Sequence, residues 1–129
     1  MTQRIAQLSL LVRDYDEAIA FYVGKLGFDL IEDTALSETK RWVVVAPKGG
    51  GARLLLAQAS GERQIAAVGD QSGGRVFLFL RTDDFTADHA AFIERGVHFI
   101  EPPRRESYGQ VAVFEDLYGN RWDLIEDRG

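Results

Sequence analysis

An internal repeat constrains the fold of this chain more than any other feature of its sequence. The segment VFLFLRTDDFTADHAAFIERGVHF, residues 76–99, repeats the order of strand, capped helix, glycine and strand found near the N-terminus. Asp14 corresponds to Asp84 at an offset of 84 − 14 = 70. Gly27 corresponds to Gly96 at an offset of 96 − 27 = 69. Landmarks that recur in the same order predict two similar units.

The repeat extends to the last strand of each unit. GARLLLA and GNRWDLI align Leu55 with Asp123, at an offset of 123 − 55 = 68. The small differences in offset fall in loops, where changes of length are tolerated. We therefore expect two βαβββ modules at about 5–58 and 75–126, joined by a linker at 59–74.

Short amphipathic patterns predict the elements within each module. Asp14 followed by Glu17 is typical of a helix N-terminus with a capping box, and Gly27 is expected to end that helix. Residues 5–12 alternate in a way that favours a strand with one face against this helix. Further strands are expected at 28–32, 41–46 and 53–58, with one helical turn at 65–68 in the linker.

Composition narrows the classes of function. The chain has 129 residues, which favours a single domain over residues 1–129. A net charge of −5 and a pI near 5.0 argue against nucleic acid as a partner. There is no cysteine to act as a nucleophile or metal ligand. The N-terminus lacks a signal peptide, and the longest apolar run, 76–80, is too short to cross a membrane, so we expect a cytoplasmic protein.

Two stretches carry a resemblance to a known family. The chain contains VRDYDEAIAFYVGKLGF at 12–28 and VFEDLYGNRWDLIE at 113–126. These fit the patterns D-x-x-x-A-x-x-F-Y…L-G-F and D-x-x-G-N-x-x-D/E-L, and the chain resembles the vicinal oxygen chelate superfamily. That superfamily includes glyoxalase I, bleomycin- and fosfomycin-resistance proteins and extradiol dioxygenases. The resemblance implies an α+β fold whose tandem βαβββ modules form a curved, cup-like mixed sheet, and it also implies a homodimer.

The same resemblance indicates where a metal would bind. Metal enzymes of the family place ligands on the first and last strand of each module. The repeat puts Gln7, Leu55, Phe77 and Asp123 at these four positions. Leu55 and Phe77 have no donor atom, whereas divalent transition metals are held by three or four donors, mainly imidazole and carboxylate. We therefore expect no stoichiometric metal and no other cofactor.

The two histidines do not restore a metal site in this interpretation. His89 falls on the second helix and His98 on the strand after it, and a 2-His-1-carboxylate site needs both on the inner wall of the cup. An arginine paired with Asp123 is the structural explanation for that carboxylate, and Arg75, Arg81 or Arg121 could supply it. The face taken by Trp42 stays open, because RWVVVA shows no alternation.

Strand alternation predicts which side chains line a ligand pocket. If Asp116 pairs with Arg121 across the last hairpin, Phe114 lies opposite Asp123 on the cup face. The segment 102–109 is expected to be a solvated loop, or a mobile rim that brings an aromatic side chain to the pocket. The candidate ligand-binding residues are Gln7, Phe77, Phe79, Tyr108, Phe114, Arg121 and Asp123.

Two functions fit these residues. The first is a small-molecule-binding protein without catalytic metal, like the bleomycin-resistance branch, which holds a partly aromatic molecule in an apolar cup. The alternative is a glyoxalase-like or dioxygenase-like enzyme that uses Asp123 as a general base or in an atypical metal site. A carboxylate among phenylalanine rings has its pKa raised toward the working range, so the sequence leaves both hypotheses open.

Overall fold

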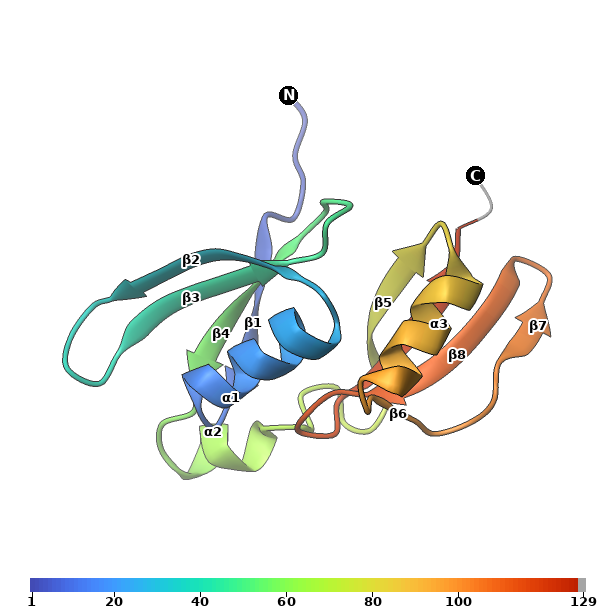
Figure 1. The fold of residues 1–129 in the computed structure, drawn as a ribbon. Coiled ribbons are helices and arrows are strands. Elements are labelled where there is room, and N and C mark those ends of the chain that lie inside the picture. The colour runs from blue at the N-terminus through green and yellow to red at the C-terminus, as the bar shows by residue number, and fades with distance from the viewer. Residues whose placement is uncertain (128–129) are drawn as a thin grey trace. The chain divides into compact units, whose positions relative to one another are not determined.

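The computed structural model describes residues 1–127 and confirms the expected α+β fold built on mixed sheets. The chain divides into two compact units, Met1–Val68 (unit 1) and Gly69–Gly129 (unit 2), each with its own sheet and helix (Figure 1). Within residues 1–127 no helix is long and apolar enough to cross a membrane.

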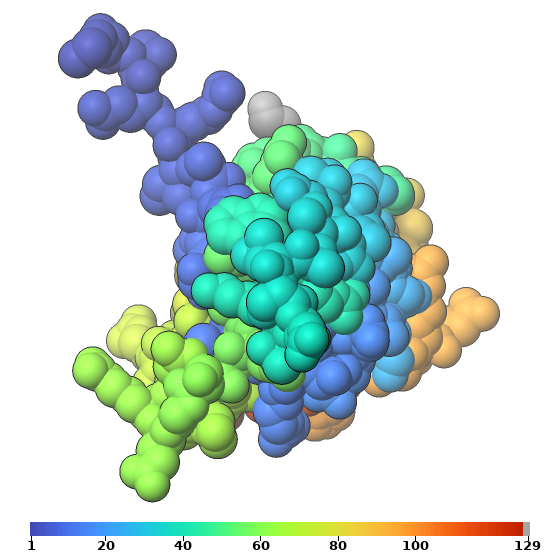
Figure 2. All heavy atoms as spheres, turned by 90° about the vertical axis from the view of Figure 1, so that its left-hand side faces the viewer, coloured from blue at the N-terminus to red at the C-terminus, as the bar shows by residue number. Residues whose placement is uncertain are grey.

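Unit 1 is a mixed four-stranded sheet with the order β1-β4-β3-β2, in which β1 runs parallel to β4. The N-terminal residues before β1 project from the body of the unit (Figure 2). The elements of unit 1 are β1 Gln7–Val12, α1 Tyr15–Ile19, a π-helix η1 Ala20–Lys25, β2 Asp29–Ala35, β3 Arg41–Ala46, β4 Arg53–Gln58 and α2 Glu62–Ala67.

Unit 2 repeats this arrangement. Its sheet has the order β5-β9-β8-β6, β5 runs parallel to β9, and β7 pairs with β8 beside the main path. The elements of unit 2 are β5 Val76–Thr82, α3 Phe85–Glu94, β6 His98–Phe99, β7 Arg104–Glu106, β8 Gly109–Glu115 and β9 Arg121–Glu126.

The N-caps predicted from the repeat are present in both units. The Asp14 side chain accepts a hydrogen bond from the backbone N–H of Glu17 at 2.9 Å. The Asp84 side chain accepts one from the backbone N–H of Ala87 at 3.2 Å. Each aspartate satisfies an N–H that has no partner within the helix, a contribution of about 1 kcal/mol. This confirms the capped helix as the repeated element.

The first helix ends differently from the regular α-helix that the spacing predicts. After α1 the backbone widens into η1, and the N–H of Leu26 donates to the carbonyl of Phe21 at 3.0 Å, five residues back. Both Phe21 and its neighbour Tyr22 are buried, with ring centroids 5.2 Å apart. A wider turn changes which residues face inward, and it accompanies the burial of these adjacent rings. Gly27 then ends the helix with a positive φ of 75°.

One face of each sheet forms a core with the helix of the same unit. In unit 1 the strands contribute aliphatic side chains to this core, whereas in unit 2 β8 and β9 also contribute the aromatic rings of Phe114 and Trp122. Each fully buried side chain of this size contributes about 1.5–3 kcal/mol. The buried strand residues are Leu10, Val12, Val43, Val45, Leu54 and Leu56 in unit 1, and Phe114, Trp122 and Leu124 in unit 2, where Phe92 of α3 packs with them.

The last hairpin is held by a single buried carboxylate. Oδ1 of Asp116 accepts hydrogen bonds from the backbone N–H groups of Tyr118 and Asn120, both at 3.0 Å. Oδ2 accepts from the Asn120 amide at 3.0 Å and from the Trp122 indole at 3.3 Å. Gly119 supplies the positive φ of 100° that the turn requires. The D-x-x-G-N signature is therefore a structural turn motif in this chain.

Two segments between the main strands differ from expectation. The segment 102–109 contains a strand, because β7 pairs with β8 and places Arg105 opposite Gln110. Charged side chains support this hairpin, since Arg104 forms ion pairs with Glu101 and Glu106. The linker holds a longer helix than one turn, α2.

Candidate functional site

Asp123 lies at the centre of β9 with an apolar neighbour on either side. In the strand register it is opposite Phe79 of β5 and Val113 of β8. Its side chain is buried, with the residue only 8% exposed. Its Oδ1 atom has no hydrogen-bond partner among the described residues. A buried carboxylate oxygen without a donor is unusual, because leaving it unsatisfied costs about 1–3 kcal/mol.

The predicted pairing of Phe114 with Asp123 is wrong. The hairpin pairs Glu115 with Arg121, which places Phe114 opposite Trp122 and on the helix side of the sheet. The Phe114 ring stacks on Trp122 with centroids 5.7 Å apart and is fully buried. The turn between β8 and β9 is one residue longer at its start than the predicted register assumed, because Asp116 belongs to the turn. Phe114 is a core residue.

Burial raises the pKa of the Asp123 carboxyl above its usual value. The positive charge of Arg104 opposes this change, and the negative charge of Glu101 adds to it. Arg104 itself is held by ion pairs with Glu101 and with Glu106, the latter at 2.8 Å. Its charge is thus largely compensated by these two partners, and Asp123 keeps a raised pKa.

The expected arginine partner of Asp123 is absent from the described residues. No ion pair joins Asp123 to Arg75, Arg81 or Arg121 within residues 1–127, and all three arginines are exposed. Arg121 shares the face of Asp123 because it lies two residues away on the same strand.

The repeat register breaks at Phe77. In unit 1 Gln7 is opposite Arg53, but in unit 2 Val76 is opposite Arg121, and the register shifts before Leu78. Phe77 therefore occupies a β-bulge, where one strand gains a residue relative to its neighbour. It is half-buried.

The remaining predicted pocket residues are spread over both units. Phe79 is 63% exposed, on the same sheet face as Asp123. Tyr108 is 48% exposed and lies in the turn between β7 and β8. Gln7 is exposed at the start of β1, in unit 1. The structure thus brings Phe79 and Asp123 together.

Both histidines have partners away from these positions. His89 packs in unit 2 between the rings of Phe85, at 5.7 Å, and Phe99, at 4.5 Å. Nδ1 of His98 lies 3.0 Å from a carboxylate oxygen of Glu115 on the neighbouring strand. In the part of the chain that the structure describes, no group of three or more His, Cys, Asp or Glu side chains is arranged to hold a metal ion.

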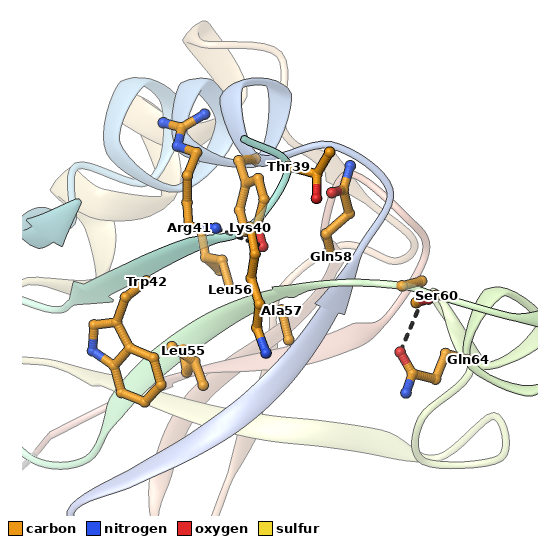
Figure 3. Close-up of a pocket in the computed structure, with 12 residues that line it drawn as sticks. Thr39, Lys40, Arg41, Trp42, Leu55, Leu56, Ala57, Gln58, Ser60 and Gln64 are labelled. Atoms are coloured by element: carbon orange, nitrogen blue, oxygen red, sulfur yellow. Dashed lines mark hydrogen bonds between the residues drawn. The ribbon is translucent and has the colours of Figure 1, made fainter. Parts of the chain in front are cut away.

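Unit 1 contains a pocket where β3 begins and β4 ends. It has a volume of about 530 Å³. Its walls come from β3, β4, the turn before β3, the start of α1, and α2 with the segment that leads into it (Figure 3). Among the residues that line it are Lys40, Arg41, Trp42, Leu55, Ala57, Gln58 and Gln64.

Strand register explains why Trp42 faces this pocket. Val44 of β3 is opposite Leu55 of β4, and Val43 is opposite Leu56. Val43 and Leu56 are fully buried in the core, so Val44 and Leu55 point to the other face. Trp42 is two residues from Val44 and shares its face. Figure 3 shows the Trp42 indole beside Leu55, with both side chains half-buried at the pocket.

An ion-pair cluster supports the upper wall of the pocket. The Arg41 guanidinium binds Asp16 at 2.9 Å and Asp33 at 2.7 Å, and it lies 5.2 Å from the ring centre of Tyr15. The guanidinium lowers the pKa of Asp33, chiefly through its hydrogen bond. The Tyr15 hydroxyl accepts from the Arg41 backbone N–H at 3.2 Å. These contacts hold the start of β3 against the helix.

Amide side chains also border the pocket. Gln58 donates to the backbone carbonyl of Arg13 at 3.1 Å, and Oε1 of Gln64 accepts from the backbone N–H of Ser60 at 2.9 Å. Sequence reasoning did not assign these residues to the site. The alternation of RLLLAQ, with Leu55 on the cup face, was the available signal for Ala57 on β4.

Comparison with known proteins adds a family and several relatives. The model of the Glyoxalase/Bleomycin resistance protein/Dioxygenase superfamily matches residues 4–124. An uncharacterized protein of Shewanella frigidimarina is 58% identical over 128 residues, covering 98% of this chain and 95% of that protein.

Solved structures resemble the fold over nearly the whole chain. The crystal structure of UcmS2 has 30% sequence identity and a TM-score of 0.83, covering 97% of this chain and 98% of that one. The structure of TnmS3, described as an antibiotic binding protein from Streptomyces sp. CB03234, has 34% identity and a TM-score of 0.78. It covers 97% of this chain and 96% of that one.

Proposed function

The chain belongs to the Glyoxalase/Bleomycin resistance protein/Dioxygenase superfamily, and from this premise we propose that it binds a small, partly aromatic molecule without a catalytic metal. The observation that carries the proposal is the pocket of about 530 Å³ in unit 1, where Trp42 and Leu55 present an apolar surface. The similarity to TnmS3, an antibiotic binding protein, supports the same class of function.

The chemistry of the pocket suits such a ligand. Small-molecule pockets are concave, commonly about 300–1,000 Å³, and combine an apolar lining with a few polar groups. Trp42 offers a large flat ring, and stacking on it adds about 0.5–1.5 kcal/mol beyond area burial. Gln58 and Gln64 supply amide groups at the rim, where they orient a ligand.

We propose that unit 2 offers a polar contact of its own at Asp123. Asp123 has an unsatisfied Oδ1 and an exposed aromatic neighbour, Phe79. A hydrogen-bond donor of a ligand would satisfy that oxygen. Within unit 2, the proposed ligand-binding residues beside Asp123 are Arg121 on the same strand, Tyr108 in the adjacent turn and Phe77 at the bulge. Within unit 1, Gln7 at the start of β1 stays a proposed ligand-binding residue.

The proposal includes a homodimer. β2 is an edge strand of its sheet, and it exposes Leu30 at 43% and Ile31 at 41%. Apolar side chains on an exposed edge favour coverage by another copy. Light scattering at micromolar concentration should report twice 14.4 kDa, and a mass near 14.4 kDa would contradict the dimer.

Calorimetric titration with naphthalene-2-carboxamide, a neutral aromatic probe, tests the binding function. Wild-type protein should bind it, and Trp42→Ala should weaken binding at least tenfold, because the stacking surface is lost. Ile93→Ala removes an exposed apolar side chain of α3 and serves as the matched control. Equal affinity in Trp42→Ala and wild type would contradict the proposal.

The raised pKa and free Oδ1 of Asp123 favour a second candidate, a glyoxalase-like or dioxygenase-like enzyme with Asp123 as base. Product formation from a hemithioacetal or a catechol, lost in Asp123→Asn with the fold retained, would support this candidate over simple binding.

A further inference from the structure

The pocket of unit 1 carries a charge opposite to that of the whole chain. The chain has a net charge of −5. The charged side chains that line the pocket in the described residues are Lys40 and Arg41, and no acidic side chain lines it. A cationic pocket on an acidic protein attracts anions and discriminates against cations.

The two cations differ in their availability. Arg41 is bound by Asp16 and Asp33 at 2.9 and 2.7 Å, so its charge is compensated. Lys40 has no ion-pair partner within 4.0 Å among residues 1–127. The ammonium of Lys40 is therefore the uncompensated charge of the pocket.

The course of the Lys40 side chain brings that charge over the apolar floor. Figure 3 shows the side chain extending across the sheet past Leu55 and Ala57, on the same face as the Trp42 indole. Lysine commonly lays its methylene groups on an apolar surface and keeps its ammonium free. An aromatic ring placed against Trp42 would have its edge within reach of this ammonium.

Gln64 adds a second donor on the same pocket. Its Oε1 atom accepts a hydrogen bond from the Ser60 backbone N–H at 2.9 Å, which fixes the orientation of the amide group. Its Nε2 group then remains to donate hydrogen bonds. The pocket thus combines an ammonium and an amide N–H, both of which suit an anionic oxygen.

We propose that the pocket selects aromatic molecules that carry an anionic oxygen, a carboxylate or a phenolate, with the ring on Trp42 and Leu55 and the anion on the Lys40 ammonium. This inference rests on the proposed binding function and names the class of ligand for the same pocket. The selection comes from one charge, and a partly exposed ion pair is modest in strength.

A matched pair of probes tests the charge directly. Naphthalene-2-carboxylate and naphthalene-2-carboxamide have the same ring, and they differ in charge at one substituent. Calorimetric titration of the wild-type protein in 50 mM salt should give about fivefold tighter binding of the carboxylate. Raising the salt to 500 mM should shrink this advantage, because the interaction is electrostatic.

Two lysine variants make the test specific. Lys40→Gln should weaken binding of the carboxylate about fivefold and leave the carboxamide unchanged. Lys48→Gln is the control, because Lys48 pairs with Asp29 at 2.6 Å and is not a lining residue of the pocket. It removes the same charge from the protein as a whole and should change neither affinity.

The possible outcomes distinguish the selection of anions from the binding function on which it rests. If both probes bind in a Trp42-dependent manner with equal affinity, or Lys40→Gln weakens both equally, the selection of anions is overturned and the binding function stands. If neither probe binds the wild-type protein at millimolar concentration, both are overturned.

Discussion

The last strands of the two units, β4 and β9, have the same place in the fold and opposite chemistry. Leu55 of β4 is opposite Ser9 of a parallel first strand, and Asp123 of β9 is opposite Phe79 in the same arrangement. Leu55 lines a pocket, whereas Asp123 is a buried carboxylate whose Oδ1 has no donor among residues 1–127. The repeat therefore preserves the path of the backbone, and single side chains on it decide what each sheet face can bind.

One core position shows a similar difference between the two units. Val45 of β3 follows Val44, the strand partner of Leu55, and Phe114 of β8 follows Val113, the strand partner of Asp123. Both Val45 and Phe114 are fully buried on the helix side of their sheets. The same position is aliphatic in one unit and aromatic in the other. The cap that starts each helix is identical, so the local signals are conserved between units while the packing is not.

The largest expected effect is on stability, and it differs between these two core positions. Phe114→Ala should lower the free energy of unfolding by about 3–5 kcal/mol, since it removes a ring that packs on Trp122 and Phe92. Val45→Ala removes two methyl groups and should cost about 2 kcal/mol. Urea denaturation measures both losses, and equal losses would show that the difference between the two side chains at this position has no energetic consequence.

Substitution of Asp123 should have a smaller effect on the free energy of unfolding, and it should stabilise the protein. The pKa of Asp123 is raised in the folded protein, so the folded state takes up the proton more readily than the unfolded chain. The resulting loss of stability develops as the pH rises from the unfolded value of about 3.9 through the folded pKa, and it is complete above that pKa.

Asp123→Asn should therefore raise the free energy of unfolding by about 1 kcal/mol at pH 7, because a buried charge is removed. The gain should disappear below about pH 3.9, where both states of the wild-type protein are protonated. Urea midpoints of variant and wild type across this range measure it. A variant that is less stable than wild type at pH 7 would indicate a donor or cation that satisfies Asp123 in solution.

We expect the protein to hold no stoichiometric metal, so a metal chelator should change neither its stability nor its ligand binding. Leu55 and Phe77 lack donor atoms, and both histidines are engaged elsewhere in unit 2. Elemental analysis of protein purified without a polyhistidine tag should find far less than one equivalent of zinc, nickel, iron or manganese per chain. Near one equivalent, lost in Asp123→Ala, would contradict this expectation and favour the enzyme.

The fold was predictable because its signals are local and repeated. Asp14 and Asp84 cap their helices as expected, and β3 and β4 have the expected bounds, since caps and short apolar runs are read within a few residues. The prediction that failed, Phe114 on the face of Asp123, depended on the register of the last hairpin. That register shifts by one residue because Asp116 belongs to the turn.

The pocket was less predictable, because it depends on pairing between strands. RWVVVA has no alternation, so only its register with β4 shows that Trp42 faces the pocket. Lys40 and Gln64 come from segments outside the sheet, and no period relates them to Trp42. The bulge at Phe77 breaks the repeat at one of the positions that the alignment used.

The two tryptophans allow the contrast between the units to be tested in one measurement. Trp42 lies on the pocket of unit 1, whereas Trp122 is buried in unit 2 with its indole bound to Asp116. Nitrogen-15 NMR resolves their two indole N–H signals during titration with naphthalene-2-carboxamide. We predict that the Trp42 signal moves progressively and saturates while the Trp122 signal stays in place. A titration that moves Trp122 alone, or neither signal, would contradict it.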